Sequence, residues 1–219
     1  MLLVPDPETR LAISYARPAA RAGLAALFAL DARLGEITRG KREVMATQFR
    51  LAWWRDALNA LGAAPPPGEP LLQALAATVV RAGVSGAALA ALVDGWEAVL
   101  GDEAVDPAVI ASRGAGLFGL AAQLLAEEAD RQVSIAGEIW ALIDHARHAG
   151  SPGAAERSIE SARLIMAAGI ATRWPKQLRM LGALAVLAMR DARHGADHLE
   201  RQGEPVRVAR MLLLRLTGR

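Results

Sequence analysis

Apolar residues recur along this chain with the spacing of helices. Between residues 18 and 38, Leu24, Leu27, Leu34 and Ile37 fall on one stripe, which indicates a helix with one buried face. Proline- and glycine-containing stretches separate further segments of the same kind. These segments predict helices over about 41–61, 70–82, 85–100, 107–128, 131–149, 154–172, 175–202 and 205–216. Strands are not indicated, because β-branched residues are sparse and do not alternate with polar ones.

The segment 41–61 carries two adjacent apolar stripes. The first comprises Leu51, Trp54, Leu58 and Leu61. The second comprises Met45, Phe49 and Trp53. Together they make an unusually wide apolar face, so we expect this helix to be buried over much of its circumference.

The composition agrees with one compact all-α domain spanning 1–219. The chain of 219 residues is 53% hydrophobic and 22% charged, and its apolar residues are mostly alanine and leucine, which favour helices. This length suits a single domain with a substantial core. The glycine-rich stretch RGAGLFG at 113–119 falls inside a helical pattern. We expect its glycines to permit close approach of a neighbouring helix or of an elongated ligand.

Charge and residue types exclude several functions. Lysine and arginine (25) nearly balance aspartate and glutamate (23), and nucleic-acid binding needs a clustered positive excess, so we expect none. The absence of cysteine excludes disulfides and zinc–sulfur sites. MLLVPDPETR at the start does not resemble a signal peptide. The most apolar run, 180–189, is about half the length of a membrane-spanning helix, so we expect a cytoplasmic protein.

The C-terminal segment PVRVARMLLLRLTGR is amphipathic and basic. One interpretation is peripheral contact with anionic lipid at the inner membrane. The other is an ordinary terminal helix docked through Val208, Met211, Leu212 and Leu214. The second is favoured, because four arginines are few for stable membrane binding.

Histidines offer one candidate metal site. Asp191, His194 and His198 have the spacing of one helical face. However, RDARHGADHLERQ around them is typical of a solvated helix end, so we expect no metal there. His145 and His148 lie near a helix C-terminus, where the helix dipole favours cationic side chains.

The segment AALFALDARLGEITRGKREVMATQFRLAWWRDAL, 25–58, resembles the opening helices of the squalene/phytoene synthase family. The ending PVRVARMLLLRLTGR is also similar to the family's. The resemblance implies an isoprenoid-synthase-like helical bundle that encloses a central cup. Family members join two prenyl diphosphates head to head, and two aspartate-rich motifs on facing helices hold the Mg²⁺ that removes diphosphate.

Both acidic motifs of the family are eroded in this sequence. GEITR, 35–39, stands at the first motif, where Gly35 and Arg39 replace acids and Glu36 remains. At the tyrosine and arginine positions that precede this motif, the chain has Phe28 and Ala32.

The second motif falls on ALIDHARHAGSP, 141–152. There Asp144 and Arg147 remain as polar positions, while His148 and Pro152 replace acids. Two carboxylates cannot build a cluster of several hard oxygen ligands, so we expect no metal, no cofactor and no Mg²⁺-dependent condensation.

Three hypotheses follow. The first is a binding protein for a prenyl diphosphate or lipid, or a protein that acts on a protein partner, similar to the phytoene-synthase-like assembly factors of respiratory complex I. The second is an active prenyltransferase that uses Mg²⁺ and an altered acid set drawn from Glu36, Asp94, Glu97 and Asp144. The third is a ligand-free helical interaction scaffold. The residues expected to face the cup or a ligand are Arg33, Glu36, Arg39, Arg50, Trp54, Asp144 and Arg147.

Overall fold

The computed structural model describes residues 6–40, 43–100, 105–170 and 173–219. In these ranges the chain forms ten α-helices and no strand, so the expected all-α class is confirmed. The α-helices are α1 (Pro7–Ile13), α2 (Pro18–Arg39), α3 (Val44–Asn59), α4 (Pro70–Leu75), α5 (Gly86–Glu97), α6 (Pro107–Leu124), α7 (Arg131–His148), α8 (Pro152–Ala167), α9 (Arg179–His194) and α10 (Pro205–Thr217). A π-helix, Ala76–Val80, continues α4.

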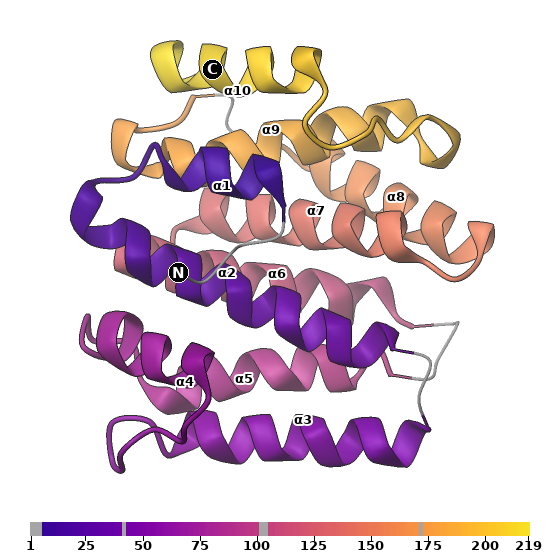
Figure 1. Ribbon diagram of the computed structural model, residues 1–219. Helices are drawn as coiled ribbons and strands as arrows, with labels where there is room; N and C mark the ends of the chain where they lie inside the picture. The colour runs from indigo at the N-terminus through magenta and orange to yellow at the C-terminus, as the bar shows by residue number, and fades with distance from the viewer. Residues whose placement is uncertain (1–5, 41–42, 101–104, 171–172) are drawn as a thin grey trace.

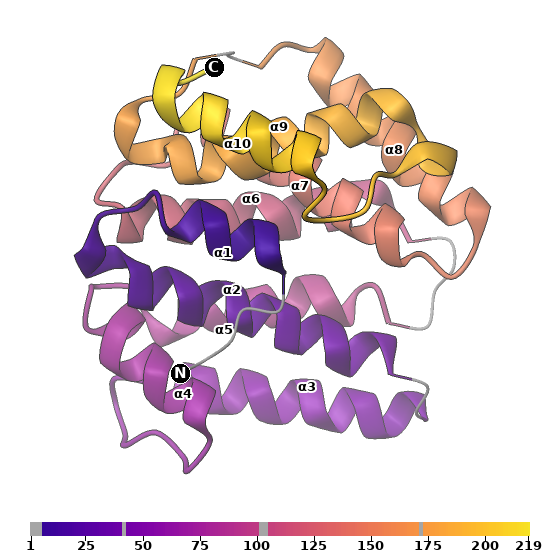
Figure 2. The ribbon, with the colours of Figure 1, turned by 45° about the horizontal axis from the view of Figure 1, so that its top comes forward.

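The helices lie in layers, with α3 at one end of the molecule and α10 at the other (Figure 1). The same order is kept when the molecule is turned (Figure 2). α2 and α6 occupy the middle, and α6 packs most extensively on α7. The leucine stripe expected on α2 is buried, since Leu24, Leu27 and Leu34 are fully covered.

Helix α1 is an element that the apolar periodicity does not indicate. Its N-cap Asp6 accepts hydrogen bonds from the backbone N–H groups of Glu8 and Thr9, and Pro7 occupies the first turn. Both features favour a helix start. The segment is too short to show a helical repeat of apolar residues.

The prediction of a single helix over 175–202 is wrong. The structure has a 3₁₀ turn at Lys176–Leu178, then α9, then a second 3₁₀ turn at Ala196–His198. Gly195 ends α9 with a φ of 90°, a left-handed conformation that glycine adopts without strain. His194 and His198 therefore do not share a helical face. Within the described ranges, no group of three histidine, aspartate or glutamate residues could hold a metal.

The second apolar stripe of α3 is exposed, so the expectation of a helix buried on much of its circumference is also wrong. Leu51, Trp54 and Leu58 are buried, but the other stripe is not. The exposed fractions are 61% for Met45, 70% for Phe49 and 47% for Trp53. α3 lies at the edge of the molecule and packs mainly on α5, and no helix of the described ranges covers its outer side. The expected start of this helix, at Lys41, lies outside the described residues.

Glycines bring α6 and α7 into close contact, as the RGAGLFG stretch predicts. A Cβ atom placed on Gly114 would lie 2.0 Å from the carbonyl oxygen of Gly137. No side chain fits between the two backbones at this point. The close approach places Arg113 of α6 beside the C-terminal part of α7.

None of the helices in the described ranges is long and apolar enough to cross a bilayer.

Candidate functional site

A half-open cavity of about 330 Å³ lies between α1, α2, α7 and α9. Its size is at the lower end of the range of small-molecule pockets, about 300–1,000 Å³. One part of the wall is apolar and includes Phe28, Trp140, Ile143, Leu184 and Leu187. The rest is charged and includes Glu8, Asp31, Glu36, Arg39, Asp144, Arg147, His148, Asp191 and Arg207.

The buried guanidinium of Arg113 joins the two helices on either side of this cavity. Its Nη1 donates to both carboxylate oxygens of Asp31 on α2, at 2.7 and 2.8 Å. Its Nη2 donates to Oδ2 of Asp144 on α7, at 3.1 Å. One cation therefore occupies the position between two carboxylates on facing helices.

Two tryptophans hold this guanidinium in place. It lies 4.1 Å from the ring centre of Trp96 and 5.7 Å from that of Trp140, and a guanidinium over an aromatic face is attracted by the ring. Trp96 also donates its indole N–H to Asp31, at 2.9 Å. Burial lowers the pKa of Arg113, but the charges of Asp31 and Asp144 outweigh burial and raise it above its ordinary value. Arg113 is thus a permanent cation.

Asp144 has two further basic neighbours. Nδ1 of His148 lies 3.4 Å from Oδ1 of Asp144, and Nη2 of Arg39 lies 3.6 Å from Oδ2. Burial opposes ionisation of Asp144, yet His148, Arg113 and Arg39 together hold its pKa well below the usual range. Nδ1 of His148 also lies 2.8 Å from the backbone carbonyl oxygen of Asp144. The interaction with the Asp144 side chain is the main cause that raises the pKa of His148.

A second charged cluster closes the other side of the cavity. Asp191 on α9 accepts from Arg147 and from Arg207, each at 2.5 Å. Arg207 also donates to both oxygens of Glu8, at 2.7 and 2.9 Å. Every carboxylate of these two clusters therefore has an arginine partner.

A model of the family described as squalene/phytoene synthase matches residues 5–151. The chain belongs to this family. The matched segment includes α2 and α7, the helices on which the eroded acidic motifs fall. No curated protein and no solved structure matches the chain.

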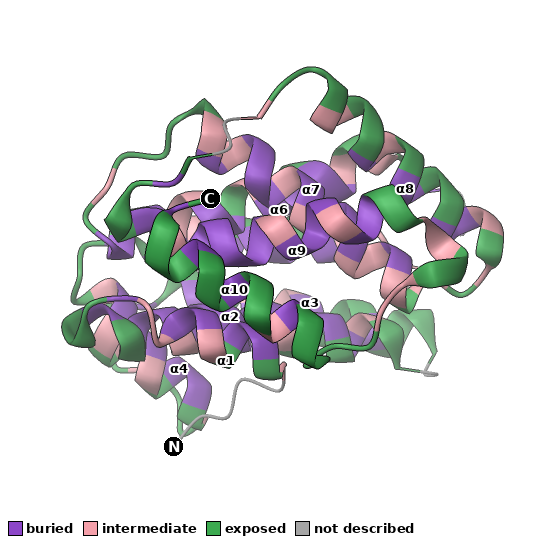
Figure 3. Cartoon of the chain, turned by 90° about the horizontal axis from the view of Figure 1, so that it is seen from above, coloured by how far each residue is buried: buried purple, intermediate pink, exposed green. Residues whose placement is uncertain are grey.

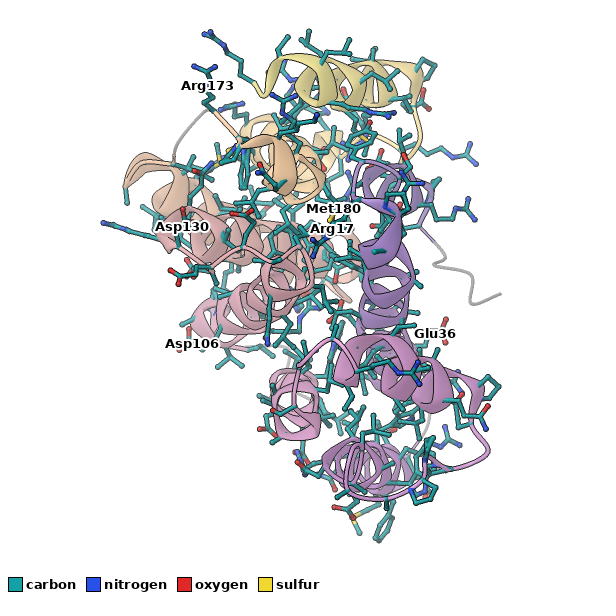
Figure 4. All side chains as sticks on the ribbon, turned by 90° about the vertical axis from the view of Figure 1, so that its left-hand side faces the viewer. Arg17, Glu36, Asp106, Asp130, Arg173 and Met180 are labelled. Carbon is teal, nitrogen blue, oxygen red and sulfur yellow. The ribbon has the colours of Figure 1, made fainter. Side chains whose placement is uncertain are left out.

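In this family member, four of the residues expected at the cup line the cavity: Glu36, Arg39, Asp144 and Arg147. Arg33 pairs with Glu36 at 3.1 Å on the exposed side of α2, and Figure 4 shows Glu36 at the outer surface of that helix.

Arg33 does not line the cavity, and neither do the two other expected residues. Arg50 is exposed and Trp54 is part of the core. Both belong to α3, which packs on α5 and α2 and lies at the far end of the molecule from α9.

The altered acid set does not converge. Arg55 donates to Asp94 at 2.8 Å and to Glu97, on the outer side of α5. Neither Asp94 nor Glu97 lines the cavity that contains Glu36 and Asp144. The four carboxylates therefore do not surround one space.

Neither the helical periodicity nor the family resemblance points to the central residues Asp31, Arg113 and Arg207. Each is a charged residue placed on an apolar helical stripe, as Asp31 is between Leu27 and Leu34. A charge on a buried stripe requires a partner, so this pattern is the signal that could have found them.

Proposed function

We propose that this member of the squalene/phytoene synthase family binds a prenyl or lipid chain without Mg²⁺ and does not condense prenyl diphosphates. The bridge from Arg113 to Asp31 and Asp144 is the observation that carries the proposal. In this geometry a guanidinium neutralises the carboxylates of the two facing helices.

The donor set does not fit the Mg²⁺ cluster that the family implies. Magnesium requires oxygen ligands in near-octahedral arrangement, while the oxygens of Asp31 and Asp144 accept from Arg113 and Trp96. Nδ1 of His148 lies a further 3.4 Å from Oδ1 of Asp144. A divalent cation at this place would also be repelled by Arg113 and Arg39. Displacing Arg113 would leave a buried charge without a partner, which costs several kcal/mol.

The apolar wall of the cavity supports binding of a chain. Phe28 and Trp140 meet edge to face with ring centres 6.0 Å apart, and Ile143, Leu184 and Leu187 continue this wall. Because the charged groups are paired with one another, burial of apolar surface supplies most of the affinity. Arg39 and His148 are partly exposed and remain able to receive a phosphate.

Calorimetric titration of the full chain with a farnesyl diphosphate analogue that cannot release its diphosphate tests the proposal. The titration is done with and without Mg²⁺. We expect the analogue to bind, and we expect addition of Mg²⁺ to change the Kd by less than about threefold, a difference under about 1 kcal/mol. Binding at least tenfold tighter with Mg²⁺, or a head-to-head product from farnesyl diphosphate, would contradict it.

A matched pair of variants on α2 locates the bound chain. Ala32 lines the cavity and is partly exposed, so Ala32→Phe fills the cavity and should abolish the heat of binding. Ala19 is exposed on the same helix and does not line the cavity, so Ala19→Phe should leave binding unchanged. Equal affinity in both variants would place the ligand elsewhere.

A second candidate function is an interaction scaffold, which the exposed stripe of α3 favours. Met45, Phe49 and Trp53 are large apolar side chains without a partner helix, and exposed apolar patches often mark protein interaction sites. Absence of heat with every prenyl or lipid ligand, with Mg²⁺ and without it, would support the scaffold over the binding protein.

A further inference from the structure

The outer face of α10 is apolar although the helix lies at the surface. α10 forms the outermost layer at one end of the molecule (Figures 1 and 3). Met211 and Leu214 are buried against the body, as expected of a docked helix, but the expectation that Leu212 docks with them is wrong, because it lies on the outer face. The opposite face exposes Val206 (58%), Leu212 (41%), Leu213 (51%) and Leu216 (78%).

Positive charges flank this apolar face. Arg210, Arg215 and Arg219 are exposed on α10 and at its end. Arg207 does not contribute, because it is buried in the ion pairs with Glu8 and Asp191.

The fold adds a second basic segment beside α10. The N–H of Trp174 donates to the carbonyl of Gly218 at 2.7 Å, and Arg179 donates to the carbonyl of Arg215 at 2.7 Å. Segment 173–179 thereby brings Arg173, Lys176 and Arg179 to the C-terminal end of α10. Figure 4 shows Arg173 pointing outward at this end of the molecule. Neither 173–179 nor 205–219 contains an acidic residue.

We propose that this surface, α10 with segment 173–179, binds the surface of an anionic phospholipid bilayer. A helix that lies in the interface places apolar side chains at the headgroup–acyl boundary and cationic ones among the phosphates. Each arginine or lysine near an anionic surface adds to the attraction. Arg179 is half-buried and holds the backbone of α10, but Arg173 and Lys176 are exposed and raise the number of exposed cations on this surface from three to five. This increase answers the objection that the C-terminal arginines alone are too few.

The exposed stripe of α3 shows why charge decides the partner. It also exposes large apolar side chains, but both signs of charge surround it: Glu43 and Asp56 are exposed beside Arg50. An anionic bilayer would gain no net electrostatic attraction there. A nucleic acid would be attracted to the cations of α10, but it would gain nothing from the exposed leucines, because phosphate contacts dominate its affinity.

Co-flotation of the full chain with vesicles tests the proposal. We expect binding to mixed phosphatidylcholine–phosphatidylglycerol vesicles, weakened by salt, and little binding to phosphatidylcholine alone. Arg210→Gln with Arg219→Gln should lower the partition coefficient about fivefold per arginine. Leu213→Ser with Leu216→Ser should lower it at least about tenfold. All four side chains are exposed, so the fold, checked by circular dichroism, should be unchanged.

The matched control is Phe49→Ser with Trp53→Ser, which removes exposed apolar side chains from α3 instead. This variant should bind vesicles like the wild type. Equal loss in the control variant, equal binding to both vesicle types, or no binding to either would overturn the proposal. Loss with the arginine variant but none with the leucine variant would also overturn it and would point to a polyanion such as a nucleic acid. The test does not depend on a ligand in the cavity.

Discussion

Arg113 is the residue on which the charged centre of the molecule depends. Removing it in Arg113→Met would leave Asp31 buried with only the indole N–H of Trp96 as a partner. Loss of one partner of a buried ion pair costs about 3–5 kcal/mol of unfolding free energy. Urea denaturation should show this loss.

Two further variants separate the unpaired charge from lost packing. Asp31→Asn combined with Arg113→Met removes both charges and should cost less than Arg113→Met alone. Arg39→Met removes a cation that is one-third exposed and 3.6 Å from Asp144, and should cost no more than about 1 kcal/mol. Equal stability of the single Arg113 variant and the double variant would show that the unpaired charge of Asp31 costs little and that the loss comes from packing.

The two histidines of α7 should titrate in opposite directions from the ordinary value. The hydrogen bond to Asp144 raises the pKa of His148, while burial and the nearby charge of Arg113 lower that of His145. Charged His148 therefore stabilises the fold below the unfolded pKa of about 6.5, and this stability is lost as the pH rises through its folded pKa. For His145 the neutral form is favoured, so its contribution weakens as the pH falls.

NMR titration of the imidazole protons measures both values. The chain has four histidines, so His145→Gln and His148→Gln assign the two resonances of α7. We expect the His148 resonance to titrate above about 6.5 and the His145 resonance below it. In His148→Gln only the higher transition should disappear. Transitions of His145 and His148 that both lie close to the ordinary value would contradict the electrostatic account of this helix end.

At the scale of elements, the contact between α6 and α7 rests on paired glycines. A Cβ atom on Gly114 would meet the carbonyl oxygen of Gly137 at 2.0 Å, so Gly114→Ala should force the helices apart and cost at least about 1–3 kcal/mol. Gly116 lies on the same helix, and a Cβ atom there has its nearest neighbour at 3.7 Å. Gly116→Ala should instead stabilise the fold by about 0.5–1 kcal/mol, and thermal unfolding would distinguish the two signs.

The adjacent tryptophans of α3 should differ sharply in their contributions. Trp54 is 4% exposed and Trp53 is 47% exposed. Trp54→Ala should cost about 3–5 kcal/mol, while Trp53→Ser at the surface should change stability by about 0.5 kcal/mol or less. Denaturation curves of the two variants measure this directly, and similar losses would mean that the outer stripe of α3 is covered by another molecule in solution.

Periodicity predicts that the apolar residues of α3 form two stripes on the helix, but it does not show which stripe has a partner helix. The same limit explains the helix expected over 175–202. The polar residues at the end of this segment continue a helical pattern, but the left-handed conformation of Gly195 ends α9 before them. Elements with a long apolar stripe, such as α2 and α7, could be predicted almost to their ends. Their neighbours could not, because packing order is a property of the whole chain.

At the scale of the whole molecule, some features of the site could be predicted from the sequence and others could not. Glu36, Arg39, Asp144 and Arg147 could be placed at the cavity from the family resemblance. The ion pairs around them could not be predicted, since Arg113 pairs with Asp31, which is 82 residues away in the sequence. The pairing of Glu8 with Arg207 spans 199 residues. Such pairs follow from the packing of distant helices and leave only the local signal of a charge on an apolar stripe.

The Glu8–Arg207–Asp191 cluster connects the two ends of the chain, because it joins α1 to α9 and α10. Glu8→Ala removes the partner of Nε and Nη2 of Arg207 and an acceptor for the backbone of Gly203. Because Arg207 is buried, we expect a loss of about 3–5 kcal/mol, borne first by the two terminal helices.

Hydrogen exchange would show this as a joint loss of protection in α1 and α10, while α6 and α7 at the centre exchange as before. Glu36→Gln, which breaks an exposed pair with Arg33, should change neither region. Loss of protection in α1 without α10 would mean that Arg207 is held by Asp191 alone. In that case the surface that we assign to the bilayer would be independent of the N-terminal helix, whereas the joint loss makes α1 part of the support for that surface.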